Sequence, residues 1–196
     1  KQCLVFDVNL GCSGYVYGLS IIGSILQNIP NGKGLLLVGD VSTATISKTD
    51  RSTTPLFSDA GSATAIQHKA GEKMFFNLQT DGKEYDDIIV PDGGFRNRTS
   101  NESFTVKEFE KGILRNALDM KLDGIKIFNF ALREIAPNVN ELLNTNSIQN
   151  QYIRRASRTG CIGFVLGLYC FGIFRGCSFV LSLCFAGFAF DATDRF

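Results

Sequence analysis

The fold of this chain is decided by residues 6–19, which read FDVNLGCSGYVYGL. The apolar run at residues 4–9 is typical of a strand, and small and polar residues follow it at positions 11–14. From residue 15 to residue 27 apolar side chains recur at helical spacing, until Pro30 and Gly32 stop the pattern. The sequence therefore predicts a strand that enters a buried helix through a tight Gly-Cys-Ser-Gly turn.

The segments that follow indicate an α/β layered fold. Residues 34–41 contain four consecutive aliphatic side chains, a pattern typical of a strand buried on both faces of a parallel sheet. The order strand, helix, strand is the signature of this fold class. Further along, the sequence predicts a polar surface loop at 42–55, strands at 74–79 and 88–90, an exposed connection at 91–103, and helices at 105–120 and 125–143, the second broken near Pro137.

Composition excludes several classes of protein. The 196 residues carry 20 Lys and Arg against 19 Asp and Glu, so the chain lacks the basic excess of a nucleic-acid binder. Six Cys with no Cys-x-x-Cys pair and a single His, His68, exclude a disulfide scaffold and a zinc site of ordinary spacing. We expect a reduced, cytoplasmic setting, and the acid at Asp7 argues against a signal peptide.

Cys12 is the candidate nucleophile. A Cys at the first turn of a helix lies beside unsatisfied backbone N–H groups and the positive end of the helix dipole, and both favour the thiolate. The flanking glycines let a carbonyl group approach the backbone, where the N–H of Cys12 could stabilise an oxyanion. The alternative interpretation is that Cys12 is a small buried apolar residue.

Four ordered blocks resemble the beta-ketoacyl-acyl-carrier-protein synthase III family. They are FDVNLGCSGYVYGL at 6–19, GDV at 39–41, DRST at 50–53 with LFSDAGSA at 56–63, and LDGIKIFNFA at 122–131. The resemblance implies an incomplete thiolase-like fold of layered sheets and helices (αβαβα), lacking the first strands and an intact C-terminal half. It also implies a homodimer, as is usual in the family.

The resemblance implies acyl transfer as the function. Family members condense an acyl-CoA with malonyl-acyl-carrier protein, so acyl-CoA and acyl-carrier protein are the implied partners, with the CoA thioester as substrate and no cofactor or metal. By position, Cys12 would be acylated, Arg51 would contact the CoA nucleotide and Phe57 would line the acyl pocket. The alternatives are a solvated loop cation for Arg51 and core packing for Phe57.

The sequence also departs from the family pattern. The family His of a His-Gln-Ala motif and the family Asn of a Gly-Asn-Thr motif are not found; the His should fall close to Thr159, and we expect His68 to be an exposed polar residue. Without them the chain should accept an acyl group but not complete the condensation. The missing first strands would expose edges and apolar surface, so we expect aggregation or dependence on a partner chain. The alternative function is a non-catalytic partner of acyl-carrier protein or of a full-length synthase subunit.

We divide the chain into three parts: 1–70 with the nucleophile, 71–153 with connecting strands and the start of the second half, and the apolar tail 154–196. Between residues 161 and 190 the tail has one charge, Arg175. Three interpretations stay open. The tail could be a membrane segment, although Arg175 would be costly there; it could be a buried pair of strands that includes 179–184; or the reading frame is lost after Ile153.

Overall fold

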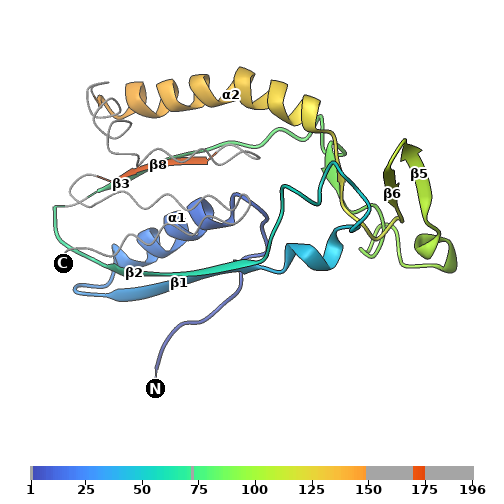
Figure 1. Ribbon diagram of the computed structural model, residues 1–196. Coiled ribbons are helices and arrows are strands. Elements are labelled where there is room, and N and C mark those ends of the chain that lie inside the picture. The colour runs from blue at the N-terminus through green and yellow to red at the C-terminus, as the bar shows by residue number, and fades with distance from the viewer. Residues whose placement is uncertain (1, 72, 149–169, 175–196) are drawn as a thin grey trace.

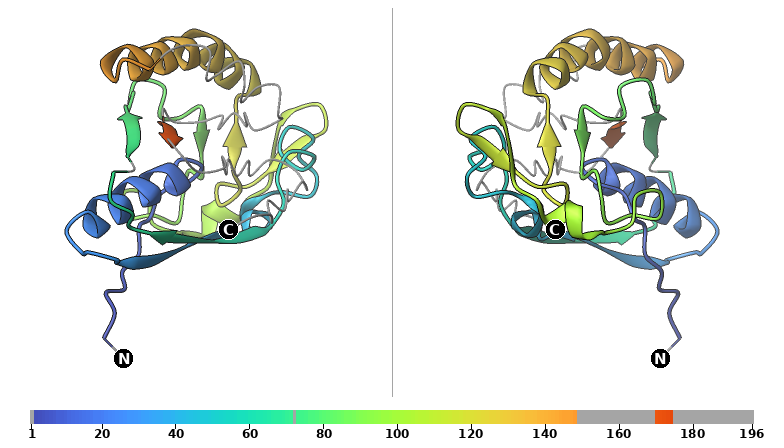
Figure 2. Two further views of the ribbon diagram at one scale, coloured as in Figure 1. Left: turned by 90° about the vertical axis from the view of Figure 1, so that its left-hand side faces the viewer. Right: turned by 90° about the vertical axis from the view of Figure 1, so that its right-hand side faces the viewer.

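The computed structural model describes residues 2–71, 73–148 and 170–174. Within these residues, helices and two-stranded sheets alternate in layers (Figure 1), and Figure 2 shows the same layers from the two ends. Helix α1 lies between two sheets, and helix α2 covers the outer side of the second sheet. The elements of these layers are α1 (Gly14–Leu26), β1 (Lys33–Asp40) with β2 (Ala60–Gln67), β3 (Met74–Leu78) with β8 (Cys170–Phe174), and α2 (Gly124–Thr145).

Helix α1 confirms the prediction for residues 15–27 to within one residue at each end. It is apolar on nearly every side because both of its broad faces pack against a sheet. Glycines allow the close approach: a methyl group on Gly18 would lie 2.7 Å from Leu36 Cδ1 of β1, and one on Gly23 would overlap the side chain of Met74 in β3. The helix is therefore the centre of the apolar core.

Strand β1 lies where the sequence predicts it, but its pairing differs from the prediction. It is antiparallel to β2, with Leu36 opposite Thr64 and Asp40 opposite Ala60, and it is covered on one face only. The side chains of Leu35 and Leu37 are 60% and 69% exposed, whereas Leu36 packs against α1. The four consecutive aliphatic residues predicted a strand that is buried on both faces. Among the described residues, only one face of β1 is covered, so this part of the prediction is wrong.

The strand predicted at residues 4–9 is absent from the structure. Residues 2–10 run as an irregular, extended segment, and Leu4 and Val5 are 73% and 80% exposed. A strand requires a neighbouring strand for its backbone hydrogen bonds, and the described part of the chain supplies none to this segment. The prediction of a strand at 4–9 is therefore wrong for the described structure, in which this apolar segment is exposed.

The helix predicted at 105–120 is wrong, because this segment forms a β-hairpin. Strands β5 (Lys107–Glu110) and β6 (Ile113–Arg115) pair through a turn in which Gly112 has φ +81°, a conformation that few other residues adopt. The predicted strands are confirmed as β3 and β4 (Ile88–Ile89), and β4 pairs with β7 (Lys121–Leu122). Two 3₁₀ turns, η1 (Ser42–Thr45) and η2 (Asn101–Phe104), complete the elements.

Helix α2 extends from Gly124 to Thr145 and includes Pro137, so the predicted break is wrong. Its first turn is capped by Asp123, whose carboxylate accepts the backbone N–H of Lys126 at 3.1 Å. Pro137 is exposed, and the buried side of the helix keeps its packing through the proline. The buried residues on this side of the helix are Ala131, Asn138, Leu142 and Leu143.

The remaining expectations fall largely outside the described residues. Of the predicted tail 154–196, the structure describes the backbone of 170–174, which is β8 and pairs antiparallel with β3. The segment 179–184 and the site expected near Thr159 lie outside the described residues. Among the described residues, no helix is both long and apolar enough to cross a membrane. The division of the chain at residues 70 and 153 stays a prediction.

Candidate functional site

The Gly-Cys-Ser-Gly turn places Cys12 at the surface, directly before α1. The N–H of Gly14 donates to the carbonyl of Gly11 at 2.8 Å, which closes the turn around Cys12 and Ser13. Cys12 is exposed, whereas Ser13 is buried. The prediction put Cys12 in the first helical turn, and the structure places it one residue before the N-cap, Ser13. The alternative interpretation of Cys12 as a buried apolar residue is therefore wrong.

The beginning of α1 carries no side-chain cap. Ser13 occupies the N-cap position, but its hydroxyl makes no hydrogen bond to the helix, and the buried Oγ has no hydrogen-bond partner. The first turn also contains no acidic side chain. The positive end of the helix dipole, and the N–H groups that a cap would satisfy, consequently lie close to Cys12. This is an environment that favours an anion at the turn.

Apolar packing fixes the turn relative to the first sheet. Tyr15, Val16 and Leu19 form the buried cluster of α1, and each is no more than 6% exposed. Tyr15 also places its hydroxyl 3.2 Å from the Thr64 hydroxyl of β2. Because Tyr15 is only three residues from Cys12, this bond and the apolar cluster hold the start of the helix in place. The surrounding residues are Tyr17, Leu36, Val38, Ile66 and Phe76.

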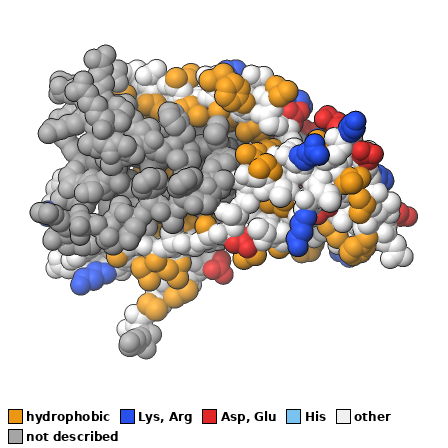
Figure 3. All heavy atoms as spheres, viewed as in Figure 1, with side chains coloured by type: hydrophobic (Ala, Val, Ile, Leu, Met, Phe, Trp, Pro, Cys, Tyr) orange, Lys and Arg blue, Asp and Glu red, His pale blue; other side chains and the backbone are white. Residues whose placement is uncertain are grey.

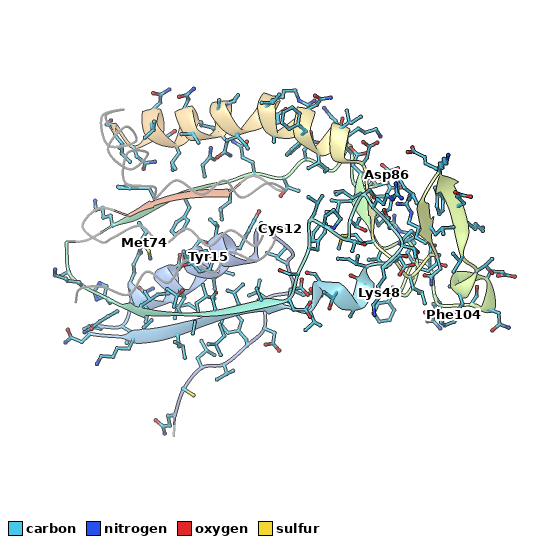
Figure 4. All side chains as sticks on the ribbon, viewed as in Figure 1. Cys12, Tyr15, Lys48, Met74, Asp86 and Phe104 are labelled. Carbon is cyan, nitrogen blue, oxygen red and sulfur yellow. The ribbon has the colours of Figure 1, made fainter. Side chains whose placement is uncertain are left out.

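The loop between β1 and β2 carries the other two predicted site residues, Arg51 and Phe57. Arg51 is exposed and Phe57 is half-buried. The loop begins after Asp40, at the end of β1 that returns to the start of α1, so it lies at the same end of the β1–β2 pair as Cys12 (Figure 4). The structure thus brings the loop and Cys12 to one end of the sheet, as a common site requires.

The loop lies at the surface, as its polarity predicts, but two of its polar side chains are buried. Asp50 and Thr53 are buried, at 1% and 0% exposure, because the loop packs against the hairpin of β5 and β6. Ser47 donates its hydroxyl to the carbonyl of Leu114 at 2.6 Å, and Thr49 donates to the same carbonyl at 3.2 Å. We call residues 42–57 together with 107–115 the loop–hairpin unit.

One ion pair at the centre of this unit was not predicted. Arg115 of β6 donates through Nη1 to Asp50 Oδ2 at 3.2 Å, and the two side chains are 11% and 0% exposed. The guanidinium of Arg115 also lies 4.4 Å from the ring centroid of Phe109 in β5. An acid directly before Arg51 was the only signal in the sequence, and its partner is 65 residues away.

His68 is half-buried and lies far from Cys12. Its backbone N–H donates to the carbonyl of Gly32 at 2.9 Å, at the end of β2 where α1 has already ended and β1 begins. Cys12 precedes the opposite end of the 13-residue helix, which at 1.5 Å per residue separates the two ends by about 20 Å. His68 is therefore no part of this site, although it is less exposed than expected.

Comparison with known proteins identifies one family. A sequence profile of the family described as 3-Oxoacyl-[acyl-carrier-protein (ACP)] synthase III matches residues 6–82. The putative 3-oxoacyl-[acyl-carrier-protein] synthase 3 of Campylobacter jejuni is 31% identical over 153 residues, which are 78% of this chain and 43% of that protein. Beta-ketoacyl-[acyl-carrier-protein] synthase III of Enterococcus faecalis is 26% identical over 158 residues, covering 80% of this chain and 46% of that protein.

Solved structures agree with the sequence comparison. A 3-oxoacyl-(acyl-carrier-protein) synthase III structure at 32% identity superposes with a TM-score of 0.68, covering 74% of this chain and 44% of that one. The 3-oxoacyl-(acyl-carrier protein) synthase of Burkholderia xenovorans, at 35% identity, gives 0.59 and covers 73% and 40%. The chain spans less than half the length of these relatives. Residues 6–82 match the 3-oxoacyl-[acyl-carrier-protein] synthase III family, and the described layers correspond to part of that family's thiolase fold.

Proposed function

We propose that this chain carries the acyl-accepting step of a synthase III condensing enzyme, with Cys12 as the nucleophile. The observation that carries the proposal is the exposure of Cys12 in a closed turn, directly before an uncapped helix N-terminus. A thiolate is the reactive form of a Cys, and this position stabilises it. The match of residues 6–82 to the family profile, which includes this turn, supports the assignment.

The step is a thioester exchange. The thiolate of Cys12 attacks the carbonyl carbon of an acyl-CoA, and the carbonyl oxygen takes up negative charge that backbone N–H groups of the turn stabilise. The bond between the carbonyl carbon and the CoA sulfur then breaks. CoA leaves as a thiolate and takes a proton from water, and the acyl group remains as a thioester on Cys12. No other covalent change is required.

Arg51 and Phe57 are proposed to bind the two ends of the same substrate. Arg51 is an exposed cation in the loop between β1 and β2, suited to the phosphates of the CoA nucleotide. Phe57 is half-buried between Arg51 and β2, where an aromatic side chain can line an apolar channel for the acyl group. Acyl-carrier protein is the proposed acceptor of the later condensation in the whole enzyme.

Acetylation of the intact protein tests the proposal. The full chain is incubated with acetyl-CoA, and its mass is measured before and after peptide mapping. We expect one acetyl group, located on Cys12. Cys3 is the matched control because it is also an exposed Cys, nine positions earlier in the sequence. Cys12→Ala should abolish the label, and Cys3→Ala should leave it unchanged.

Two results would count against the proposal. One is an unmodified mass in a sample whose circular dichroism shows it to be folded. The other is a label that persists in Cys12→Ala and maps to Cys3. If Cys12→Ala also leaves co-purification with a full-length synthase subunit unchanged, the non-catalytic partner function is the better account of the chain.

A second copy of the chain is the proposed partner for the apolar surface beside β1. Leu35 and Leu37 project from the uncovered face of β1, and Leu4, Val5 and Phe6 are exposed in the N-terminal segment. Figure 3 shows hydrophobic side chains gathered on this side of the molecule. An apolar patch of this kind is typical of an interface. Sedimentation velocity should therefore detect a dimer, and Leu37→Lys should shift it toward the monomer.

A further inference from the structure

We infer that Asp50 and Arg115 are positioning residues that hold Arg51 in place for the nucleotide end of the substrate. The inference rests on the proposed role of Arg51 in binding CoA. It adds the hairpin of β5 and β6 to the machinery of the site, through a side chain that lies 65 residues from Asp50 in the sequence.

The Asp50 carboxylate closes a turn around Arg51. Its Oδ1 accepts the backbone N–H of Ser52 at 2.7 Å and the Ser52 hydroxyl at 2.5 Å, which places Arg51 at the middle of an Asx turn. The carbonyl of Asp50 also accepts the N–H of Thr54 at 3.0 Å. The backbone of Arg51 is therefore bracketed by hydrogen bonds that all converge on Asp50.

Arg115 anchors the same carboxylate from the opposite side. It donates to Oδ2, the oxygen that the turn does not use, so both oxygens of the buried Asp50 have partners. A buried carboxylate that lost this cation would be left with uncompensated charge, and the turn would have to shift toward solvent. Phe109 covers the other side of the Arg115 guanidinium and limits its freedom to follow. The hairpin thus fixes the turn, and the turn fixes Arg51.

The side chain of Arg51 runs across the tip of this hairpin. A methyl group on Gly112 would lie 3.4 Å from Arg51 Nε and 3.5 Å from Cζ, so the guanidinium lies over the glycine at the turn. The hairpin therefore supports both the backbone and the side chain of Arg51. Arg51 stays exposed, which leaves its N–H donors accessible to a phosphate group.

Binding of adenosine 3′,5′-bisphosphate, the nucleotide end of CoA, tests the inference without any acyl transfer. Calorimetry gives the Kd for the full chain and for Arg51→Ala, Arg115→Met and the double variant. Arg51→Ala removes a charge-assisted contact with phosphate, and Arg115→Met removes the ion pair that holds Arg51 in place. We therefore expect about tenfold weaker binding in each single variant. The double variant should bind no more weakly than Arg51→Ala, because Arg115 acts through Arg51.

The control is Lys121→Met, which removes a cation from the exposed pair with Asp86, 3.8 Å apart, and should leave the Kd unchanged. If circular dichroism shows that Arg115→Met is unfolded, Asp50→Asn takes its place. The Asn side chain can still accept the Ser52 N–H but loses the ion pair with Arg115, so we expect weaker binding of the bisphosphate. The inference is overturned if a folded Arg115→Met or Asp50→Asn variant binds the bisphosphate as tightly as the wild-type chain. It is also overturned if Arg115→Met weakens binding by the same factor in the Arg51→Ala background as in the wild-type chain. If the wild-type chain binds no bisphosphate, both the inference and the proposed role of Arg51 are overturned. The proposed role of Cys12 is then still decided by the acetylation experiment.

Discussion

The layers around α1 and the loop–hairpin unit are stabilised by opposite kinds of interaction. The first is held by apolar side chains such as Val16 and Leu19, and the hydroxyl of Tyr15 joins the start of the helix to the sheet. The second buries Asp50 and Thr53 and depends on hydrogen bonds and the pair with Arg115. Figure 3 shows the same division, since charged side chains gather at the end of the molecule that carries β5 and β6.

The difference matches the chemistry proposed for each region. A nucleophile requires a fixed position, and non-directional apolar packing holds a helix rigidly once its volume is filled. Recognition of a phosphate group requires an oriented guanidinium, and hydrogen bonds supply direction. The chain thus uses packing to place Cys12 and polar contacts to place Arg51.

The largest expected effect is on the apolar side of this comparison. Leu19→Ala removes a side chain that is 4% exposed, so the free energy of unfolding should fall by about 3 kcal/mol. Leu132→Ala is the matched control, because Leu132 is 67% exposed and its truncation should change stability by no more than about 0.5 kcal/mol. Urea denaturation measures both. Equal losses in the two variants would show that α1 is not the centre of the core.

A smaller effect is expected in the loop–hairpin unit. Asp50→Asn keeps the turn around Arg51 but removes the charge that faces Arg115, and hydrogen bonds to charged groups suggest a loss of about 2 kcal/mol. Asp86→Asn is the control: its carboxylate is 54% exposed in the pair with Lys121, and exposed pairs contribute about 0.5 kcal/mol. If raising the salt concentration weakens both pairs equally, the pair of Asp50 and Arg115 is not protected from solvent as its burial implies.

The smallest effect concerns Asp59, which joins the two regions. The backbone N–H of Thr43, at 2.9 Å, and then its hydroxyl, at 2.7 Å, lower the pKa of Asp59 below the ordinary 3.8. A lowered folded pKa stabilises the fold above the ordinary pKa, and this contribution is lost as the pH falls through the folded pKa. In an NMR titration, Thr43→Val should raise the pKa partway toward its ordinary value, because the backbone bond remains.

Thr45→Val is the control for that titration, since the Thr45 hydroxyl donates to the carbonyl of Ser42 and is not among the causes of the Asp59 pKa shift. A full return of the Asp59 pKa to its ordinary value in Thr43→Val would instead show that the hydroxyl is the main cause. An unchanged pKa would show that the backbone bond acts alone.

The apolar region was largely predictable from the sequence, because its pattern is local. The spacing of Val16, Leu19 and Leu26 predicted α1, and the turn at Cys12 followed from the residues around it. The direction of β1 was not predictable in the same way. Four aliphatic residues in a row fit a strand buried on both faces, and only its pairing with β2 shows the antiparallel arrangement.

The loop–hairpin unit was poorly predictable because its determinants are distant in the sequence. Val106, Phe109 and Ile113 have helical spacing, but Gly112 at φ +81° reverses the chain between them, and Val106 and Phe109 are more than half exposed. Likewise, nothing near Asp50 indicates burial, since the cation that compensates its charge comes from β6. A polar core of this kind becomes visible only when both partners are placed in space.

The way the loop leaves the sheet has an evolutionary consequence. Asp40 pairs directly with Ala60, and a methyl group on Gly39 would lie 3.2 Å from the Ala60 carbonyl oxygen, so the chain departs from and returns to the sheet at one narrow point. Residues 41–59 can therefore be lengthened, shortened or exchanged without altering the register of β1 and β2 or the position of α1. With the roles proposed above, the substrate-binding loop and the nucleophile lie in separate parts of the chain, so selection can change the loop while it preserves the turn at Cys12.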